Sequence, residues 1–261
     1  NIVVSQPARY FLAKIFYSTK KIFSKVPSIE QMNKKGFVLI ENFLSDDEYN
    51  VINNQYLEII QDKNFAVNFK QEIDKKDEEN IRITHIYLDK KTAGKYFEIF
   101  NLKNNKKIID LFRSCELKKN IFIQAYLERI ENINNKVIDI QKTFHYDTFH
   151  NTFKVFFYLN DVTNKNSPFL FVEDSHKFTF RRLFKEWLLS IKYSLKKIPD
   201  DSFRDKISVN DKIKSFTLKK NTLVMVNVNG LHRRGDSIEG SIRDAIVFYT
   251  RENPFKIFLD N

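Results

Sequence analysis

The chain has 261 residues, of which 42% are hydrophobic and 30% charged, and it carries 26 Phe but only 5 Gly and 5 Pro. A chain of this length and apolar content can bury a core, which excludes global disorder and the Gly-rich and collagen-like classes. A single cysteine, Cys115, excludes an intrachain disulfide and a cysteine-rich zinc site, and it favours a cytoplasmic, intracellular location.

The formal net charge is +11, which raises the question of a polyanionic partner. The lysines are spread along the chain and no recognised nucleic-acid-binding motif accompanies them, so we do not expect nucleic acid as a partner. No apolar run approaches the roughly 18 residues that a membrane span needs.

Residues 1–35 form a basic N-terminal segment. Apolar residues alternate with lysines over 9–26, which predicts an amphipathic helix. Such a helix could contact an anionic membrane surface. We favour the alternative, in which its apolar stripe packs on the core of its own domain.

Residues 36–118 read as a helix-rich support. Residues 36–43 (GFVLIENF) alternate like a short strand, and Ser45 with Glu48 forms a capping box that starts a helix ending near Gln61. The charged stretch 62–80 reads as a loop or insertion. Further helices are predicted over 92–103 and 106–116.

From residue 119 the sequence pattern changes from helix-like to strand-like, and residues 119–255 are predicted to form a β-rich catalytic core. Strands are predicted over 121–127, 136–141, 153–159, 168–172, 213–218, 222–228 and 244–250, with a helical excursion over 179–197. No linker divides the chain, so 1–261 is interpreted as one domain. Short strands without alternating helices predict an antiparallel barrel or double sheet such as a jelly roll.

Three residues have the types and spacing of a metal site. His145 and Asp147 are two apart, so on an extended segment both side chains point to the same side. His232 follows a predicted strand and a turn at 229–230. Two histidines and one carboxylate form the facial triad of non-haem Fe(II) oxygenases, which leaves positions open for a co-substrate and O₂.

Arg243 opens the last predicted strand. A buried arginine is costly unless it meets an anion, and its planar fork suits a carboxylate. A dicarboxylate such as 2-oxoglutarate could chelate the metal at one end and pair with Arg243 at the other.

With these motifs in this order, the sequence resembles the phytanoyl-CoA dioxygenase family of Fe(II)- and 2-oxoglutarate-dependent oxygenases. The resemblance covers most of 36–255 and lies in GFVLIENFLSDDE (36–48), FHYD (144–147), FKVFFYLNDV (153–162), SPFLFVEDSHK (167–177), NGLHRRG (229–235) and FYTRENPF (248–255). It departs from the usual pattern where Ser167 and Asp174 stand in place of glycine, which affects a loop and leaves the triad intact.

The resemblance implies a double-stranded β-helix (jelly-roll, cupin-like) core with N-terminal helices packed on it. It also implies that His145, Asp147 and His232 bind the iron and that Arg243 pairs with the far carboxylate of 2-oxoglutarate. Weaker contacts to the co-substrate are expected from Ser241 and Gln124.

The implied reaction is a hydroxylation that consumes O₂ and 2-oxoglutarate and releases succinate and CO₂. An intact Asp147 argues against a halogenase-type site. The basic chain and the adjacent Arg233 and Arg234 fit an anionic small molecule or a carrier-linked acyl group as substrate. Candidate substrate contacts are Tyr146, His150, His176 and Arg233. For His176 a turn anchor is favoured over a substrate contact, and His150 also fits a pocket-wall or surface position. A salt-bridged rim explains Arg233 and Arg234 equally well. Oligomeric state stays open.

Two alternatives belong to other classes. One is a non-catalytic jelly-roll module that binds an anionic ligand or a membrane surface. The other is an enzyme of the same barrel shape that uses another metal for isomerase or hydrolase work, against which Arg243 argues.

Overall fold

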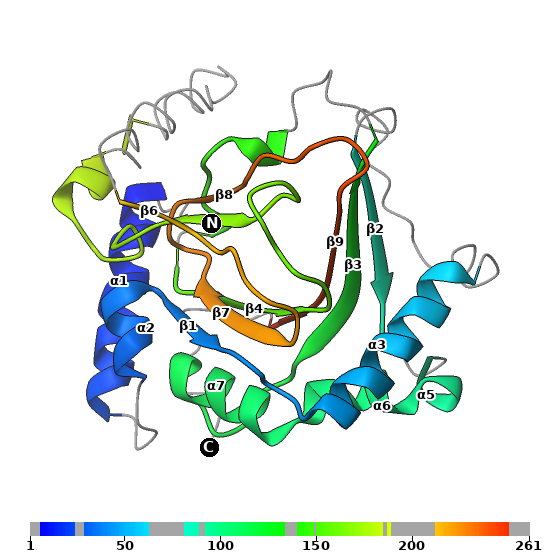
Figure 1. The fold of residues 1–261 in the computed structure, drawn as a ribbon. Coiled ribbons are helices and arrows are strands. Elements are labelled where there is room, and N and C mark those ends of the chain that lie inside the picture. The colour runs from blue at the N-terminus through cyan, green and yellow to red at the C-terminus, as the bar shows by residue number, and fades with distance from the viewer. Residues whose placement is uncertain are drawn as a thin grey trace.

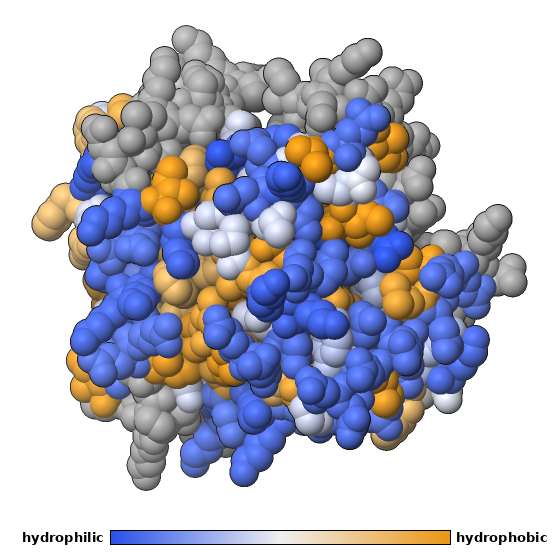
Figure 2. All heavy atoms as spheres, viewed as in Figure 1, coloured by the Kyte–Doolittle hydropathy of each residue, from blue (hydrophilic) through white to orange (hydrophobic). Residues whose placement is uncertain are grey.

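A computed structural model describes residues 6–23, 29–62, 81–88, 92–133, 140–148, 150–184, 187–188 and 212–250. Within these ranges no helix is both long and apolar enough to cross a membrane. On the face shown in Figure 2, hydrophilic residues predominate and apolar side chains show between them toward the centre.

Two antiparallel sheets form the body of the protein (Figure 1). The larger has six strands in the order β1-β7-β4-β9-β3-β2, and the smaller has three in the order β6-β5-β8. The strands are β1 (Phe37–Ile40), β2 (Ile81–Tyr87), β3 (Gln124–Asn132), β4 (Phe153–Tyr158), β5 (Phe169–Val172), β6 (Ile213–Ser215), β7 (Thr222–Asn227), β8 (His232–Arg234) and β9 (Ile242–Tyr249). The mixed order of strands from distant parts of the chain confirms the predicted jelly-roll class.

The two faces of the large sheet belong to different cores. On β4, Val155 and Phe157 join the core under the helices, whereas Phe156 and Tyr158 join the core between the sheets. Because both faces are covered, β4 is a nearly continuous apolar run rather than a clean alternation. Residues of even number on β3 and β4 therefore face the interior of the jelly roll.

The helices α3 (Asp46–Gln61), α5 (Thr92–Lys95), α6 (Phe97–Asn101) and α7 (Lys106–Glu116), with the 3-10 turn η1 (Leu102–Asn104), support the outer face of this sheet. The capping box at Ser45 and Glu48 is confirmed. Tyr56 of α3 is fully buried and its hydroxyl donates to Asp244 Oδ1 at 2.6 Å. Asp244 is also held by Arg129, so α3 is tied to the β3–β9 pair.

Helix α1 (Gln6–Phe23) packs on the domain with one face, and α2 (Glu30–Lys35) leads into β1. Tyr10 and Ala13 of α1 are buried, and Lys14 Nζ donates to Asn151 Oδ1 at 2.9 Å and to the His176 carbonyl at 2.8 Å. Burial, together with the nearby charge of Arg182, lowers the pKa of Lys14 to about 7. The other face of α1 is exposed.

Several elements differ from the sequence-based expectation. Strands β2 and β8 were not predicted, and β3 begins at Gln124 rather than 121 and runs to Asn132. The helix expected over 92–103 is three short pieces. The strand expected over 136–141 lies mostly outside the described residues, and its end is the 3-10 turn η2 (Ile140–Lys142). The stretch 62–80, apart from Asp62 at the end of α3, and most of 179–197 also lie outside them, but 180–184 and 187–188 are helical.

Candidate functional site

His145 and His232 are joined by an isolated β-bridge between the loop before β4 and the first residue of β8. The His145 amide donates to the His232 carbonyl at 2.9 Å, and the His232 amide donates back at 3.0 Å. The Asp147 amide donates to the Val228 carbonyl at 3.1 Å. Backbone hydrogen bonds thus hold three side chains from segments far apart in the sequence beside one another.

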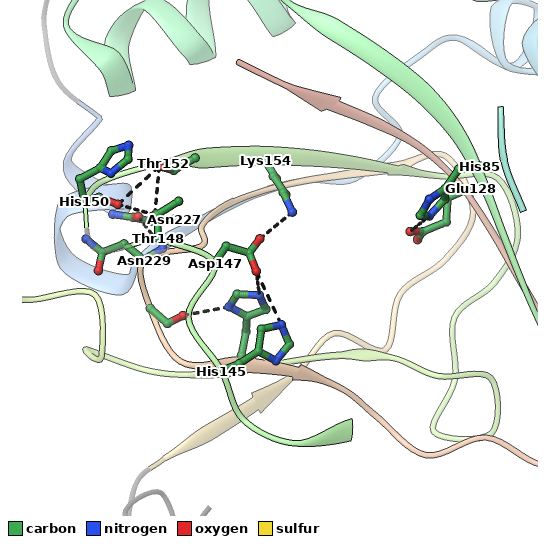
Figure 3. A network of polar contacts seen from close by, with 12 residues as sticks. His85, Glu128, His145, Asp147, Thr148, His150, Thr152, Lys154, Asn227 and Asn229 are labelled. Atoms are coloured by element: carbon green, nitrogen blue, oxygen red, sulfur yellow. Dashed lines mark hydrogen bonds and ion pairs between the residues drawn. The ribbon is translucent and has the colours of Figure 1, made fainter. Parts of the chain in front are cut away.

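The three side chains converge, and Figure 3 shows two of them, His145 and Asp147, pointing toward each other. Their ligand atoms all lie within 4.8 Å of one another. Asp147 Oδ1 lies 3.6 Å from His145 Nε2 and 3.3 Å from His232 Nε2. The group could hold a metal ion, since imidazole nitrogen and carboxylate oxygen suit first-row divalent metals.

The far nitrogen of each ring is fixed by a backbone carbonyl. His145 Nδ1 lies 2.8 Å from the Thr143 carbonyl and His232 Nδ1 lies 2.9 Å from the Gly230 carbonyl. A carbonyl only accepts, so each Nδ1 carries a proton and each Nε2 lone pair is directed at the carboxylate. Acceptors that face one another need a cation between them, either a proton or a metal ion.

Lys154 of β4 holds the second oxygen of Asp147, with Nζ 2.6 Å from Oδ2. Burial alone would raise the pKa of Asp147, but its contact with His232 and the charge of Lys154 hold the pKa well below its usual range. Asp147 is therefore ionised at neutral pH. Sequence reasoning left the role of Lys154 open, although the alternation of β4 places it on the interior face.

Across the interior from Asp147, Figure 3 shows Glu128 beside His85. Glu128 Oε1 accepts from Arg243 Nη2 at 2.9 Å, and Oε2 lies 3.2 Å from His85 Nε2. Arg243 is buried, as expected, and its Nη1 donates to the Ser167 carbonyl. Burial would raise the pKa of Glu128, but His85 and Arg243 hold it well below its usual range.

Sequence reasoning missed Glu128 and His85. They face each other in the β2–β3 register, and Glu128 lies diagonally opposite Arg243 in the β3–β9 register. The interior alternation of Gln124, Tyr126 and Glu128 on β3 was the available signal.

Of the two weaker candidates for co-substrate contact, Gln124 lies on the interior face and Ser241 lies in a turn. Gln124 is the first residue of β3 and lies on the same face as Glu128. Ser241 lies in the turn before β9, and its hydroxyl donates to the Ile238 carbonyl at 2.6 Å rather than toward Arg243.

Of the candidate substrate contacts, Tyr146 lies between two triad residues, and its ring is 3.8 Å from the Arg182 guanidinium. Figure 3 places His150 in a separate group with Thr148 and Thr152, away from Asp147. The Thr148 hydroxyl donates to the His150 carbonyl at 2.7 Å.

His176 is buried, and its Nε2 lies 3.2 Å from the Asn33 carbonyl, which makes it an anchor between the β5 turn and α2. Burial lowers the pKa of His176 to about 4, although the hydrogen bond to Asn33 opposes the shift.

Arg233 faces away from the interior. It is opposite Leu170 in the β5–β8 register, and its guanidinium lies 5.3 Å from the Phe144 ring. Because side chains alternate along a strand, Arg234 rather than Arg233 shares a face with His232. The register therefore places Arg234 on the interior side, where its charge also acts on the buried Glu128.

The model of the phytanoyl-CoA dioxygenase (PhyH) family matches residues 32–188. Among solved structures, EctD from S. alaskensis with bound Fe is 17% identical, with a TM-score of 0.61 over 88% of this chain and 79% of that one. AviO1 from Streptomyces viridochromogenes Tue57 is 15% identical, with a TM-score of 0.54 over 86% and 93%.

A third structure is the non-heme alpha ketoglutarate dependent carbocyclase SnoK from nogalamycin biosynthesis. It is 14% identical, with a TM-score of 0.55 over 88% of this chain and 85% of that one. At such identities these likenesses show a shared fold. No curated protein matches the sequence.

Proposed function

Since the chain belongs to the phytanoyl-CoA dioxygenase family of Fe(II)- and 2-oxoglutarate-dependent dioxygenases, we propose that it hydroxylates an unactivated C–H bond of a small anionic molecule. The observation that carries the proposal is the convergence of His145, Asp147 and His232, with ligand atoms within 4.8 Å of one another, on one side of a jelly-roll interior.

The donor set fits Fe(II). Two imidazole nitrogens and one ionised carboxylate oxygen are the ligands of the facial triad. Each Nε2 is directed inward because its ring is fixed from behind by a carbonyl. His145, Asp147 and His232 would therefore hold the metal. When bound, iron with 2-oxoglutarate and O₂ supplies the oxidising chemistry, which yields succinate, CO₂ and a hydroxylated product.

The other residues position and shield this chemistry. Lys154 keeps Asp147 Oδ2 engaged, so that Oδ1 faces the histidines. The Phe169 ring stacks on His232 at 5.1 Å and limits its rotation. Arg243 would hold the distal carboxylate of 2-oxoglutarate: among the described residues its buried Nε–H has no hydrogen-bond partner, which leaves a donor for an incoming anion.

The anionic character of the substrate rests on Arg234. This cation shares the interior side of β8 with His232, whereas Arg233 points to the opposite face. An anionic group on the substrate would be attracted into the interior by Arg234, which lies on the same face of β8 as His232.

An oxygen-free titration tests the co-substrate half of the proposal. Purified apoprotein is titrated with Fe(II) and 2-oxoglutarate, and the weak visible charge-transfer band of the chelated keto acid is recorded. We expect the band in the wild type, its loss in His145→Ala, and much weaker 2-oxoglutarate binding in Arg243→Ala. Arg233→Ala is the matched control and should keep the band, because that guanidinium faces away from the interior.

Hydroxylation itself is tested in air with a panel of small anionic compounds. Substrate-dependent succinate release, together with a product one oxygen atom heavier by mass spectrometry, supports the proposal. If folded, metal-loaded protein gives no charge-transfer band, the oxygenase proposal fails and a non-catalytic binding module takes its place.

A further inference from the structure

The guanidinium expected to hold the co-substrate already has a carboxylate partner within the protein. Arg243 Nη2 donates to Glu128 Oε1 at 2.9 Å, and the two side chains are only 6% and 9% exposed. A buried guanidinium and a buried carboxylate form a pair with no net charge. A second carboxylate added beside this pair brings two negative charges to one guanidinium in a poorly solvated interior, which is unfavourable.

His85 can add a positive charge directly beside Glu128 when it takes up a proton. Its Nε2 lies 3.2 Å from Glu128 Oε2, so the carboxylate bridges Arg243 and His85 with one oxygen each. The His85 side chain is 22% exposed, which lets it exchange a proton with solvent. Histidine is also the side-chain type that ordinarily changes charge between pH 5 and 8.

Neighbouring strands place other ionisable groups around this cluster, and the fixed positive charge of one of them, Arg234, also acts on Glu128. They are Tyr87 of β2, Tyr126 of β3, Tyr158 of β4, Arg234 of β8 and Tyr249 of β9. Tyrosine ordinarily titrates near pH 10 and arginine stays charged. Burial raises the pKa of Tyr126 well above that of a free tyrosine and that of Tyr158 to about 12. Asp147 lies at the other end of the interior and is held ionised by Lys154.

We propose that Glu128 is a built-in competitor for the Arg243 guanidinium, and that binding of the distal carboxylate of 2-oxoglutarate takes up one proton from solvent, shared between His85 and Glu128. The inference rests on the proposed function. With the proton bound, the three side chains and the incoming carboxylate are neutral together. Without it, Glu128 and the co-substrate oppose each other at the same guanidinium.

The consequence is a dependence of co-substrate affinity on pH. A binding step that takes up one proton weakens by up to about ten-fold for each pH unit above the range in which the proton is already bound. A keto acid without a distal carboxylate, such as 2-oxobutyrate, does not approach Arg243 and should bind with the same affinity across this range.

The experiment is an oxygen-free titration of the Fe(II)-loaded full chain with 2-oxoglutarate or 2-oxobutyrate at pH 6.5, 7.25 and 8.0, followed by the charge-transfer band. For the wild type we expect the Kd of 2-oxoglutarate to rise several-fold or more over this range while that of 2-oxobutyrate stays constant. Calorimetry in two buffers with different ionisation enthalpies should show uptake of about one proton for 2-oxoglutarate alone.

Two variants and a control test the residues. Glu128→Gln should bind 2-oxoglutarate about ten-fold more tightly than the wild type at pH 8.0 and lose the pH dependence. His85→Gln should also lose the pH dependence, but with weak binding throughout. Glu131→Gln, on the outer face of the same strand, should behave as the wild type.

The outcomes separate the two proposals. A wild-type 2-oxoglutarate Kd that stays constant with pH, with no proton uptake, overturns the inference and leaves the proposed function standing. The comparison of the two keto acids needs no substitution, so it decides the matter even if Glu128→Gln does not fold. Absence of the band with both keto acids at every pH overturns the proposed function itself.

Discussion

Gly230 tests how tightly the fold fixes the candidate metal centre. A Cβ built at this position would lie 2.5 Å from two carbons of the Phe171 ring and 3.0 Å from Ser175 Oγ. Phe171 is fully buried, and its ring also lies against Gly36 on another side, where a Cβ would come within 2.8 Å. The ring therefore has no room to move away from Gly230.

Gly230→Ala should consequently overpack the interior. Overpacking of this kind costs about 1–3 kcal/mol of unfolding free energy, or on the order of 5 °C in Tm for a chain of this size. The Gly230 carbonyl also accepts from His232 Nδ1 at 2.9 Å, so a shift of this residue turns the imidazole. Loss of such a supporting contact weakens metal binding by about 10-fold or more.

Urea denaturation gives the stability change, and equilibrium titration with Fe(II) under argon gives the metal affinity. Gly94→Ala is the control, because a Cβ there meets nothing within 4 Å and α5 should gain about 0.5–1 kcal/mol from alanine. Adding Phe171→Leu to Gly230→Ala should cost less than the two single changes together, because the leucine makes room for the methyl group. Wild-type stability in Gly230→Ala would refute the packing argument.

Three further predictions concern charge and hydrogen bonding. His176 has a folded-state pKa of about 4 against 6.5 when unfolded, so only the unfolded state takes up a proton as the pH falls below 6.5. Between pH 6.5 and 5.0 His176 should therefore remove about 1.6 kcal/mol of stability, seen as the difference in slope between wild type and His176→Gln in denaturation against pH. Tyr56→Phe, which removes the hydroxyl that donates to Asp244 at 2.6 Å, should cost about 1–2 kcal/mol in urea denaturation, and an unchanged midpoint would contradict the role of that bond. Asp147→Asn should lower Fe(II) affinity at least 100-fold in the same metal titration with little change in Tm, because it removes an ionised ligand at a partly exposed position.

Much of the fold could be predicted from local sequence signals. The capping box at Ser45 fixed the start of α3, and dense apolar runs fixed β4 and β7, because these depend on residues near one another in the chain. Strand β2 was missed although IRITHIY alternates, since a charged stretch precedes it and draws the interpretation toward a loop. The short strand β8 was missed because its pairing with β5 is visible only in three dimensions.

In the candidate site, too, the residues predicted from the sequence are those that depend on local spacing, and the ones missed depend on strand register. His145 and Asp147 could be predicted together because a two-residue spacing is a local property of an extended chain. The burial of Arg243 was predicted, but its partner was not, because which residue of β3 lies near it depends on the β3–β9 register. Side chains alternate along a strand, so Arg234 rather than Arg233 shares a face with His232. The sequence alone could therefore have predicted that Arg234 faces the interior.

The two carboxylates of the interior, Asp147 and Glu128, have similar partners but suit different cations. Asp147 gives one oxygen to Lys154 and the other to two histidines, whereas Glu128 gives one oxygen to Arg243 and the other to a single histidine. Two imidazoles fixed from behind by carbonyls can share a metal ion with the carboxylate. At the other end, His85 and Glu128 offer only two ligand atoms, and Glu128 is already paired with a guanidinium. Two ligand atoms are too few for a metal site, so this pair is suited to binding a proton. A co-substrate that spans the interior would then bind a metal ion at one end and a proton-dependent guanidinium at the other, so its affinity should follow both iron loading and pH.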